Sequence, residues 1–81
     1  MNIDLEYLEV TAVKPLQNQM LNLEFSNGES RFFDMKPYLD KGIFRELKDQ
    51  KYFQRVTLGH GTVTWPHEQD MSTIRLYLEG K

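Results

Sequence analysis

The pair Asn27-Gly28 constrains the fold of this chain most strongly, because it follows a run in which apolar and polar residues alternate over positions 21–25. Such alternation is typical of a strand with one buried face. Asn-Gly favours a two-residue type I′ turn, in which both central residues need positive φ. We therefore predict a β-hairpin whose register is set by this turn. The predicted register pairs Glu24 with Arg31 and Leu23 with Phe32.

Two other parts of the sequence predict strands. Apolar and polar residues alternate over positions 8–14, with Leu8, Val10 and Ala12 on the apolar side, and Pro15 follows. Residues 56–58 and 63–65 flank a turn at Gly59-His60-Gly61, and Pro66 ends the second strand because proline has no N–H to donate. We expect all these strands to pair in antiparallel fashion.

Helical turns are predicted between the strands and after them. Asp34 and Asp49 can each cap a turn that begins just after them, and apolar residues recur at helical spacing over positions 43–47. Ser72 can cap a final helix that stops at Gly80. The residues expected to share the buried face of this helix are Ile74, Tyr77 and Leu78.

The length of 81 residues predicts a single α+β domain over positions 1–81. Its expected architecture is a small antiparallel sheet of four or five strands, with two short helical regions on one face. A chain of this size buries only roughly 60–65% of the surface that its unfolded form exposes. Association with a second chain is therefore a plausible source of additional stability.

The composition indicates a cytoplasmic protein. Cysteine is absent from the sequence, which excludes disulfides and thiolate metal sites and fits a reducing compartment. No apolar run approaches the roughly 20 residues that span a bilayer, and the N-terminus lacks the basic start of a signal peptide. We expect no membrane association.

The charge is unevenly distributed along the chain. The net charge is −2, yet residues 36–55 contain six basic and three acidic side chains, giving +3. This basic segment could contact nucleic acid. Alternating signs on a solvated helical surface are the commoner explanation of such a pattern.

An ordered set of anchor residues spans most of the chain: Leu23, Phe25, Asn27-Gly28-Glu29, Phe44, Leu47, Phe53, Val56, Thr64-Trp65-Pro66 and Asp70. This set resembles the bacterial family called domain of unknown function 2442. The resemblance implies a compact α+β domain without an established enzymatic activity. Some members of the family resemble partners of a neighbouring small protein in toxin–antitoxin-like gene pairs. Some longer relatives carry a helix-turn-helix segment. The printed sequence reaches Lys81 without one, so we do not expect DNA binding of that kind.

Residues 67–71 begin like the zinc-protease motif H-E-x-x-H, but Met71 stands in place of the second histidine. His60, His67, Glu68 and Asp70 could in principle supply metal ligands, and exposed histidines without a metal are the expected alternative. We predict that Asp70 instead accepts backbone N–H groups at the start of the last helix.

The remaining motifs favour a structural role. Trp65 could stack on a ring ligand, but in so small a domain its burial in the core is the stronger expectation. The run 59–62 lacks the Lys-Ser/Thr ending of a phosphate-binding loop, and no serine lies in a nucleophile-elbow sequence. We predict no catalytic residue, no cofactor and no metal.

The function predicted from the sequence is a non-enzymatic protein-interaction module: an antitoxin-like or accessory partner, or a homodimer. The alternative is a nucleic-acid-binding regulator that uses the basic segment 36–55. Aromatic residues that could border an interaction surface are Tyr7, Phe44, Tyr52, Phe53 and Tyr77. The residues assigned to an interaction or structural motif are Trp65, Pro66, Asp70, Phe44, Tyr52, Arg45 and Lys48.

Overall fold

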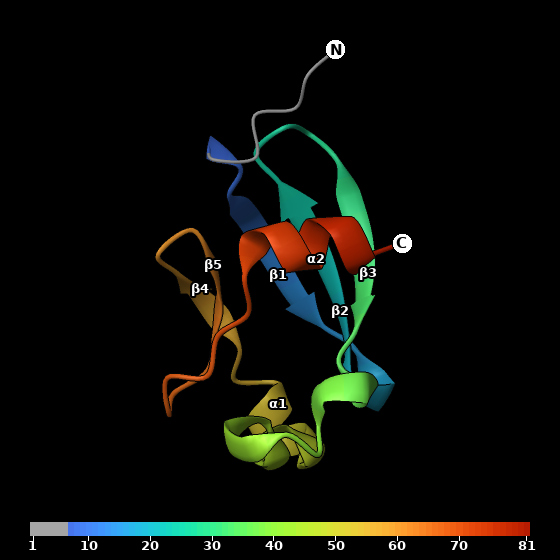
Figure 1. Cartoon of the computed structure of the whole chain (residues 1–81), viewed down its shortest axis with the longest axis vertical. Helices are drawn as coiled ribbons and strands as arrows, with labels where there is room; N and C mark the ends of the chain where they lie inside the picture. Colours follow the sequence, from blue (N-terminus) through green and yellow to red (C-terminus); the bar gives the residue numbers. More distant parts are fainter. Residues whose placement is uncertain (1–6) are drawn as a thin grey trace.

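The computed structural model describes residues 7–81 and confirms the α+β class (Figure 1). Five antiparallel strands form two sheets, with the orders β1-β2-β3 and β4-β5. The strands are β1 (Val10–Pro15), β2 (Met20–Phe25), β3 (Ser30–Asp34), β4 (Thr57–Gly59) and β5 (Thr62–Thr64). The helices are η2 (Gln17–Gln19), η3 (Lys36–Tyr38), η4 (Gly42–Lys48), α1 (Gln50–Phe53) and α2 (Thr73–Glu79). None of the helices in residues 7–81 is long and apolar enough to cross a membrane.

The β2–β3 hairpin forms where the sequence predicts it, but the predicted turn and register are wrong by one residue. The loop contains three residues, 26–28, and only Gly28 has positive φ, at 88°. Gly28 N–H donates to the Phe25 carbonyl, and Phe25 N–H donates to the Glu29 carbonyl, both at 2.9 Å. The Asn27 side chain accepts the Glu29 N–H at 3.0 Å, an Asx turn that favours this longer loop.

The corrected register changes which side chains share a face. Leu23 pairs with Arg31, and Asn22 pairs with Phe32. Because a one-residue shift moves each side chain to the opposite face, Arg31 joins the core side and Phe32 turns away from it. Phe32 is consequently 50% exposed.

Strand β1 also departs from simple alternation, because a bulge shifts its register between Val10 and Ala12. Val10 pairs with Phe25 before the bulge, and Val13 pairs with Leu23 after it, so both valines face the core. The sequence pattern predicts Ala12 on the same face as Leu8 and Val10. In the structure Ala12 instead pairs with Glu24 and lies on the opposite face. An extra residue in one strand causes this change of phase.

The β4–β5 hairpin has the tight turn expected around Gly59-His60-Gly61. Its two loop residues both have positive φ, 55° at His60 and 78° at Gly61, as a type I′ turn requires. Val10 N–H donates to the Gly61 carbonyl at 2.8 Å and connects this hairpin to β1.

The helical turns lie at one end of the molecule (Figure 1). Helix α1 begins at the predicted cap Asp49, whereas the N-cap of η3 is Met35, and Asp34 contacts this turn from one residue earlier. The Asp34 carboxylate accepts the Lys36 N–H at 2.9 Å, and the Asp49 carboxylate accepts the Lys51 N–H at 3.0 Å. Residues 42–48 form a 3-10 helix in which Leu47 is buried.

Helix α2 lies across the three-stranded sheet (Figure 1) and is capped by the Ser72 hydroxyl, as predicted. Its buried residues are Leu76 and Tyr77. The predicted buried face was wrong at two positions, because Ile74 is 42% exposed and Leu78 is 64% exposed. The helix presents Tyr77 to the sheet, where its ring packs edge-on against Phe25 at a centroid distance of 5.2 Å.

The core lies between the inner face of the three-stranded sheet, α2, the β4–β5 hairpin and the helical turns. Its fully buried side chains include Leu21, Leu23, Met35, Leu47, Phe53, Val63 and Leu76. The opposite side of the sheet, here called the outer face, carries Ala12, Lys14, Met20, Asn22, Glu24, Ser30, Phe32 and Asp34.

Candidate functional site

The segment Trp65–Asp70 forms a corner between β5 and the approach to α2. Trp65 is 2% exposed, and its indole N–H donates to the Phe53 carbonyl at 2.9 Å. Pro66 is exposed two residues after β5, which ends at Thr64. The Trp65 N–H donates to the Gln69 carbonyl, which closes the corner on itself. Trp65 therefore contributes to the core, and its ring is not available to stack on a ligand.

Gln69 connects this corner to the helical turns, a role that the sequence did not reveal. Its side chain is 1% exposed, the one polar side chain buried to this degree in residues 7–81. Its Oε1 accepts the Tyr52 hydroxyl at 2.6 Å. Its Nε2 donates to the Ile43 carbonyl and to Glu46 Oε1, both at 3.0 Å. A buried amide with all these partners is a structural element, since buried polar groups require hydrogen bonds.

His67 takes part in the same network without forming a metal site. Its Nδ1 lies 2.7 Å from Glu46 Oε2, and its backbone N–H donates to the Tyr52 hydroxyl at 2.9 Å. His60 is exposed in the β4–β5 turn. Within the described part of the chain, no three side chains of His, Asp or Glu are placed to hold a metal ion.

Asp70 is not the cap of α2, contrary to prediction. Its side chain is exposed, and the residue instead forms a backbone bridge with Thr64. The Ser72 hydroxyl accepts the Arg75 N–H at 3.4 Å and supplies the cap two residues later. Asp70 lies outside the first turn because Met71, which follows it, is buried in the core and the helix begins only after Met71.

The aromatic residues considered as the border of an interaction surface do not form one exposed patch. Tyr52, Phe53 and Tyr77 are buried, and Phe44 is partly buried against the core. Tyr7 is 75% exposed. Most of these rings therefore stabilise the fold, and an interaction surface has to be sought elsewhere.

The basic segment is interrupted by acidic partners. Lys36 lies 3.0 Å from the Asp34 carboxylate, and Lys48 lies 2.5 Å from that of Asp40. The hydrogen bond from Lys48 lowers the pKa of Asp40. Arg45 Nε donates to the Asp40 carbonyl at 3.5 Å. Positive charge is thus partly neutralised where a phosphate backbone would need it.

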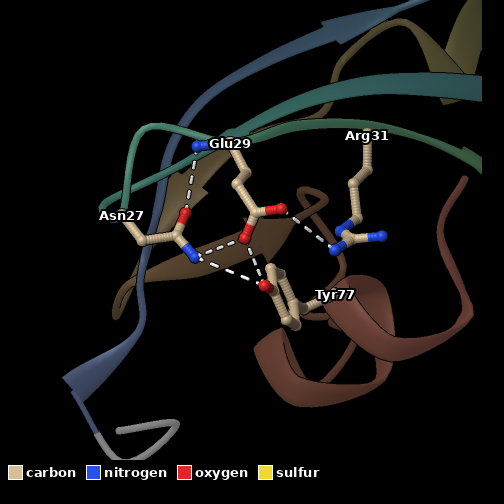
Figure 2. A network of polar contacts seen from close by, with 4 residues as sticks. All are labelled: Asn27, Glu29, Arg31 and Tyr77. Carbon is tan, nitrogen blue, oxygen red and sulfur yellow. Dashed lines mark hydrogen bonds and ion pairs between the residues drawn. The ribbon is translucent and has the colours of Figure 1, made fainter. Parts of the chain in front are cut away.

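A second polar network, also missed from the sequence, joins the β2–β3 hairpin to α2 (Figure 2). The Tyr77 hydroxyl donates to the Glu29 carboxylate, which also accepts the Asn27 amide at 2.8 Å. Arg31 lies 3.3 Å from the other Glu29 oxygen. The hydrogen bond from Tyr77 lowers the pKa of Glu29 most. Burial acts in the opposite direction as the second-largest cause, and Arg31 and Asn27 lower the pKa further, so the net shift is downward.

Arg31 is held between this network and the end of α2. Its guanidinium carbon lies 4.2 Å from the centre of the Tyr77 ring, a cation–π contact. Its buried Nε has no hydrogen-bond partner among the described residues. A Cβ at Gly80 would come within 3.1 Å of the Arg31 Cβ and 2.5 Å of the Leu76 carbonyl, so glycine is required there. The network orients α2 on the sheet and contains no reactive centre.

The outer face contains the remaining candidate surface. Between β1 and β2 it has an open hollow of about 160 Å³, lined by Ala12, Val13, Lys14, Asn22 and Glu24. Phe32 lies on the next strand, directly across from Asn22.

Residues 10–81 match the model of a family described as protein of unknown function (DUF2442). The chain belongs to this family. The resemblance seen in the sequence is thereby confirmed, and the DUF2442 match covers every described strand and helix. No curated protein and no solved structure matches the chain. The DUF2442 description names no activity, so the function has to be argued from the residues themselves.

Proposed function

We propose that this DUF2442 domain binds another polypeptide and catalyses no reaction. The observation that carries the proposal is the outer face of the sheet, which has a half-exposed phenyl ring at Phe32 beside an open hollow. Large aromatic side chains are the preferred anchors of protein interfaces, especially next to a pocket. The inner face is fully used by the core, so the outer face is the side of the sheet left for a partner.

The polar groups of the molecule support the same proposal. The Gln69 network and the Glu29 network are both occupied with internal hydrogen bonds. A catalytic site needs a polar group with free access to substrate and a second group to assist it. The two networks described above hold helices and loops in place instead, which leaves binding as the better supported role.

An antitoxin-like or accessory role is the specific form of this proposal, following the family resemblance. The test is co-expression of the domain with the product of the neighbouring gene, followed by size-exclusion chromatography with light scattering. We expect a complex of defined mass that is weakened by Asn22→Arg, at the centre of the outer face. Leu78→Ser, on the exposed side of α2, is the control and should leave the complex intact.

The proposal would be contradicted if the domain formed no complex with that product and did not self-associate at any accessible concentration. A complex lost on Leu78→Ser and retained in Asn22→Arg would place the binding surface on α2 instead.

A further inference from the structure

The outer face combines a projecting ring and a hollow at known positions. The register aligns Lys14, Asn22 and Phe32 in one row across the three strands, and Ala12, Glu24 and Ser30 in the next row. The hollow lies over the β1–β2 side of these rows, and Phe32 lies on β3. Asn22 separates the two, so the ring does not fill the hollow of its own molecule.

The hollow has a suitable size for one aromatic ring. Its volume of about 160 Å³ is close to the roughly 150 Å³ of a cavity that accommodates benzene. A ring and a pocket on the same face form a self-complementary surface. In a two-fold symmetric dimer, each copy supplies the ring for the hollow of the other, and both contacts form together.

We propose that a second copy of this chain covers the outer face, with Phe32 of each copy placed in the hollow of the other. This inference rests on the proposed function and specifies its partner. The alternative occupant, an unrelated protein, is distinguished by the experiment below.

The charges of the outer face favour a second copy. Lys14 and Glu24 lie on either side of the hollow, and neither forms an ion pair within residues 7–81. The third charged residue of the face, Asp34, is paired with Lys36 at 3.0 Å. Two copies of a face with one positive and one negative charge outside ion pairs do not repel each other, whereas a strongly charged partner would gain little from it.

The edges of the same sheet are less suitable for association, which favours the face. On β3, the Phe32 N–H and carbonyl are both engaged by Lys81, at 2.9 and 2.8 Å. On β1, Pro15 has no N–H, and the Val10 N–H is already bonded to Gly61. Addition of a strand from another chain requires a row of free backbone groups, and these contacts interrupt both rows.

The size of the face predicts a weak dimer. The face is about six residues long, at about 3.4 Å per residue, and three strands wide, at about 4.8 Å per strand. It therefore measures roughly 20 by 14 Å. This is smaller than the roughly 800 Å² per partner of a stable interface, so we expect association that depends strongly on concentration.

The proposal is tested by sedimentation equilibrium of the full chain. The concentration is varied from about 10 μM to 1 mM, the range in which weak interfaces form. We expect the wild type to dimerise and Phe32→Ser to weaken the dimer by about tenfold or more, as for an anchor residue. Ala12→Ile, which fills the hollow, should have the same effect. Leu78→Ser removes an exposed apolar side chain from α2 and should have none.

Circular dichroism of each variant verifies that it is folded, and concentration-dependent NMR shifts locate the contact. Shifts confined to the outer face support the proposal. A wild type that stays monomeric at 1 mM, or a dimer unaffected by both Phe32→Ser and Ala12→Ile, overturns it. If the monomer still binds the neighbouring gene product, only this inference fails; if it binds nothing, the proposed function fails too.

Discussion

Two tyrosine hydroxyls, one buried and one near the surface, join distant parts of this chain in different ways. Tyr52 donates to the amide of Gln69, which is 1% exposed. Tyr77 donates to the carboxylate of Glu29, whose side chain is 46% exposed. Water can replace a lost partner of Glu29, but it cannot readily reach Gln69. The same type of contact should therefore contribute more to stability at the buried position.

The two networks also differ in what they hold. The Gln69 network connects the loop after β5 to η4 and α1, elements that share few backbone hydrogen bonds with it. The Glu29 network connects α2 to a hairpin against which the helix already packs through Phe25. The first network thus determines a loop conformation, and the second adjusts a helix that packing already places.

The largest effect is expected for Gln69→Leu. The leucine has a similar volume but leaves the Tyr52 hydroxyl without an acceptor and removes two further hydrogen bonds. We expect the free energy of unfolding to fall by about 2–3 kcal/mol in urea denaturation. Gln54→Leu, at an exposed position, is the matched control and should change it by less than about 0.5 kcal/mol. Equal effects of the two variants would refute the importance of the buried amide.

Tyr52→Phe should have the next largest effect. It removes the donor to Gln69 and the acceptor of the His67 N–H but retains the ring. We expect a loss of about 1–2 kcal/mol in the same measurement. A double-mutant cycle with Gln69→Leu should show a large coupling free energy, because both substitutions break the same hydrogen bond, between Tyr52 and Gln69.

Tyr77→Phe should destabilise the domain less than Tyr52→Phe does. Glu29 keeps its contacts with Asn27 and Arg31 and is open to water. The Phe ring still packs on Phe25, so α2 should remain in place. If urea denaturation ranks the two tyrosines in the opposite order, burial does not decide their contribution.

The smallest effect is the part of the pH dependence that comes from the Glu29 network. The pKa of Glu29 is lowered in the folded state, first by the Tyr77 hydroxyl. A lowered pKa stabilises the fold above the ordinary pKa of the carboxyl group, about 4.3, and this contribution is lost as the pH falls through the folded value. Thermal melts between about pH 7 and pH 3 should show the loss below about pH 4.3, and Glu29→Gln should reduce it. An unchanged acid profile in Glu29→Gln would exclude this carboxylate as a contributor.

The sequence was sufficient for the elements of the fold but not for their register. Alternation over 21–25, the caps Asp49 and Ser72, and the turn near His60 are local features, and each appears in the structure. The β2–β3 register failed because Asn27 forms an Asx turn in place of a type I′ turn. Local preference allows both, and the turn that forms places Arg31 against the ring of Tyr77.

The residues of the candidate site and of the outer face were harder to predict for the same reason. Gln69 lies in a polar run and differs from its neighbours only through partners 17–26 positions away. Phe32 belongs to an apolar pair with Phe33, and only the register reveals which ring is exposed. A pair of adjacent aromatics in a strand is the signal that could have identified the outer face, since one of the two must leave the core.

Trp65 is the single tryptophan of the chain, and its indole lies in the buried corner beside Phe53. Its fluorescence emission is consequently a site-specific optical reporter of the corner, free of overlapping signals from other indoles. Paired with the amide signals of α2, it can show whether the corner and the helix melt in one step or in two.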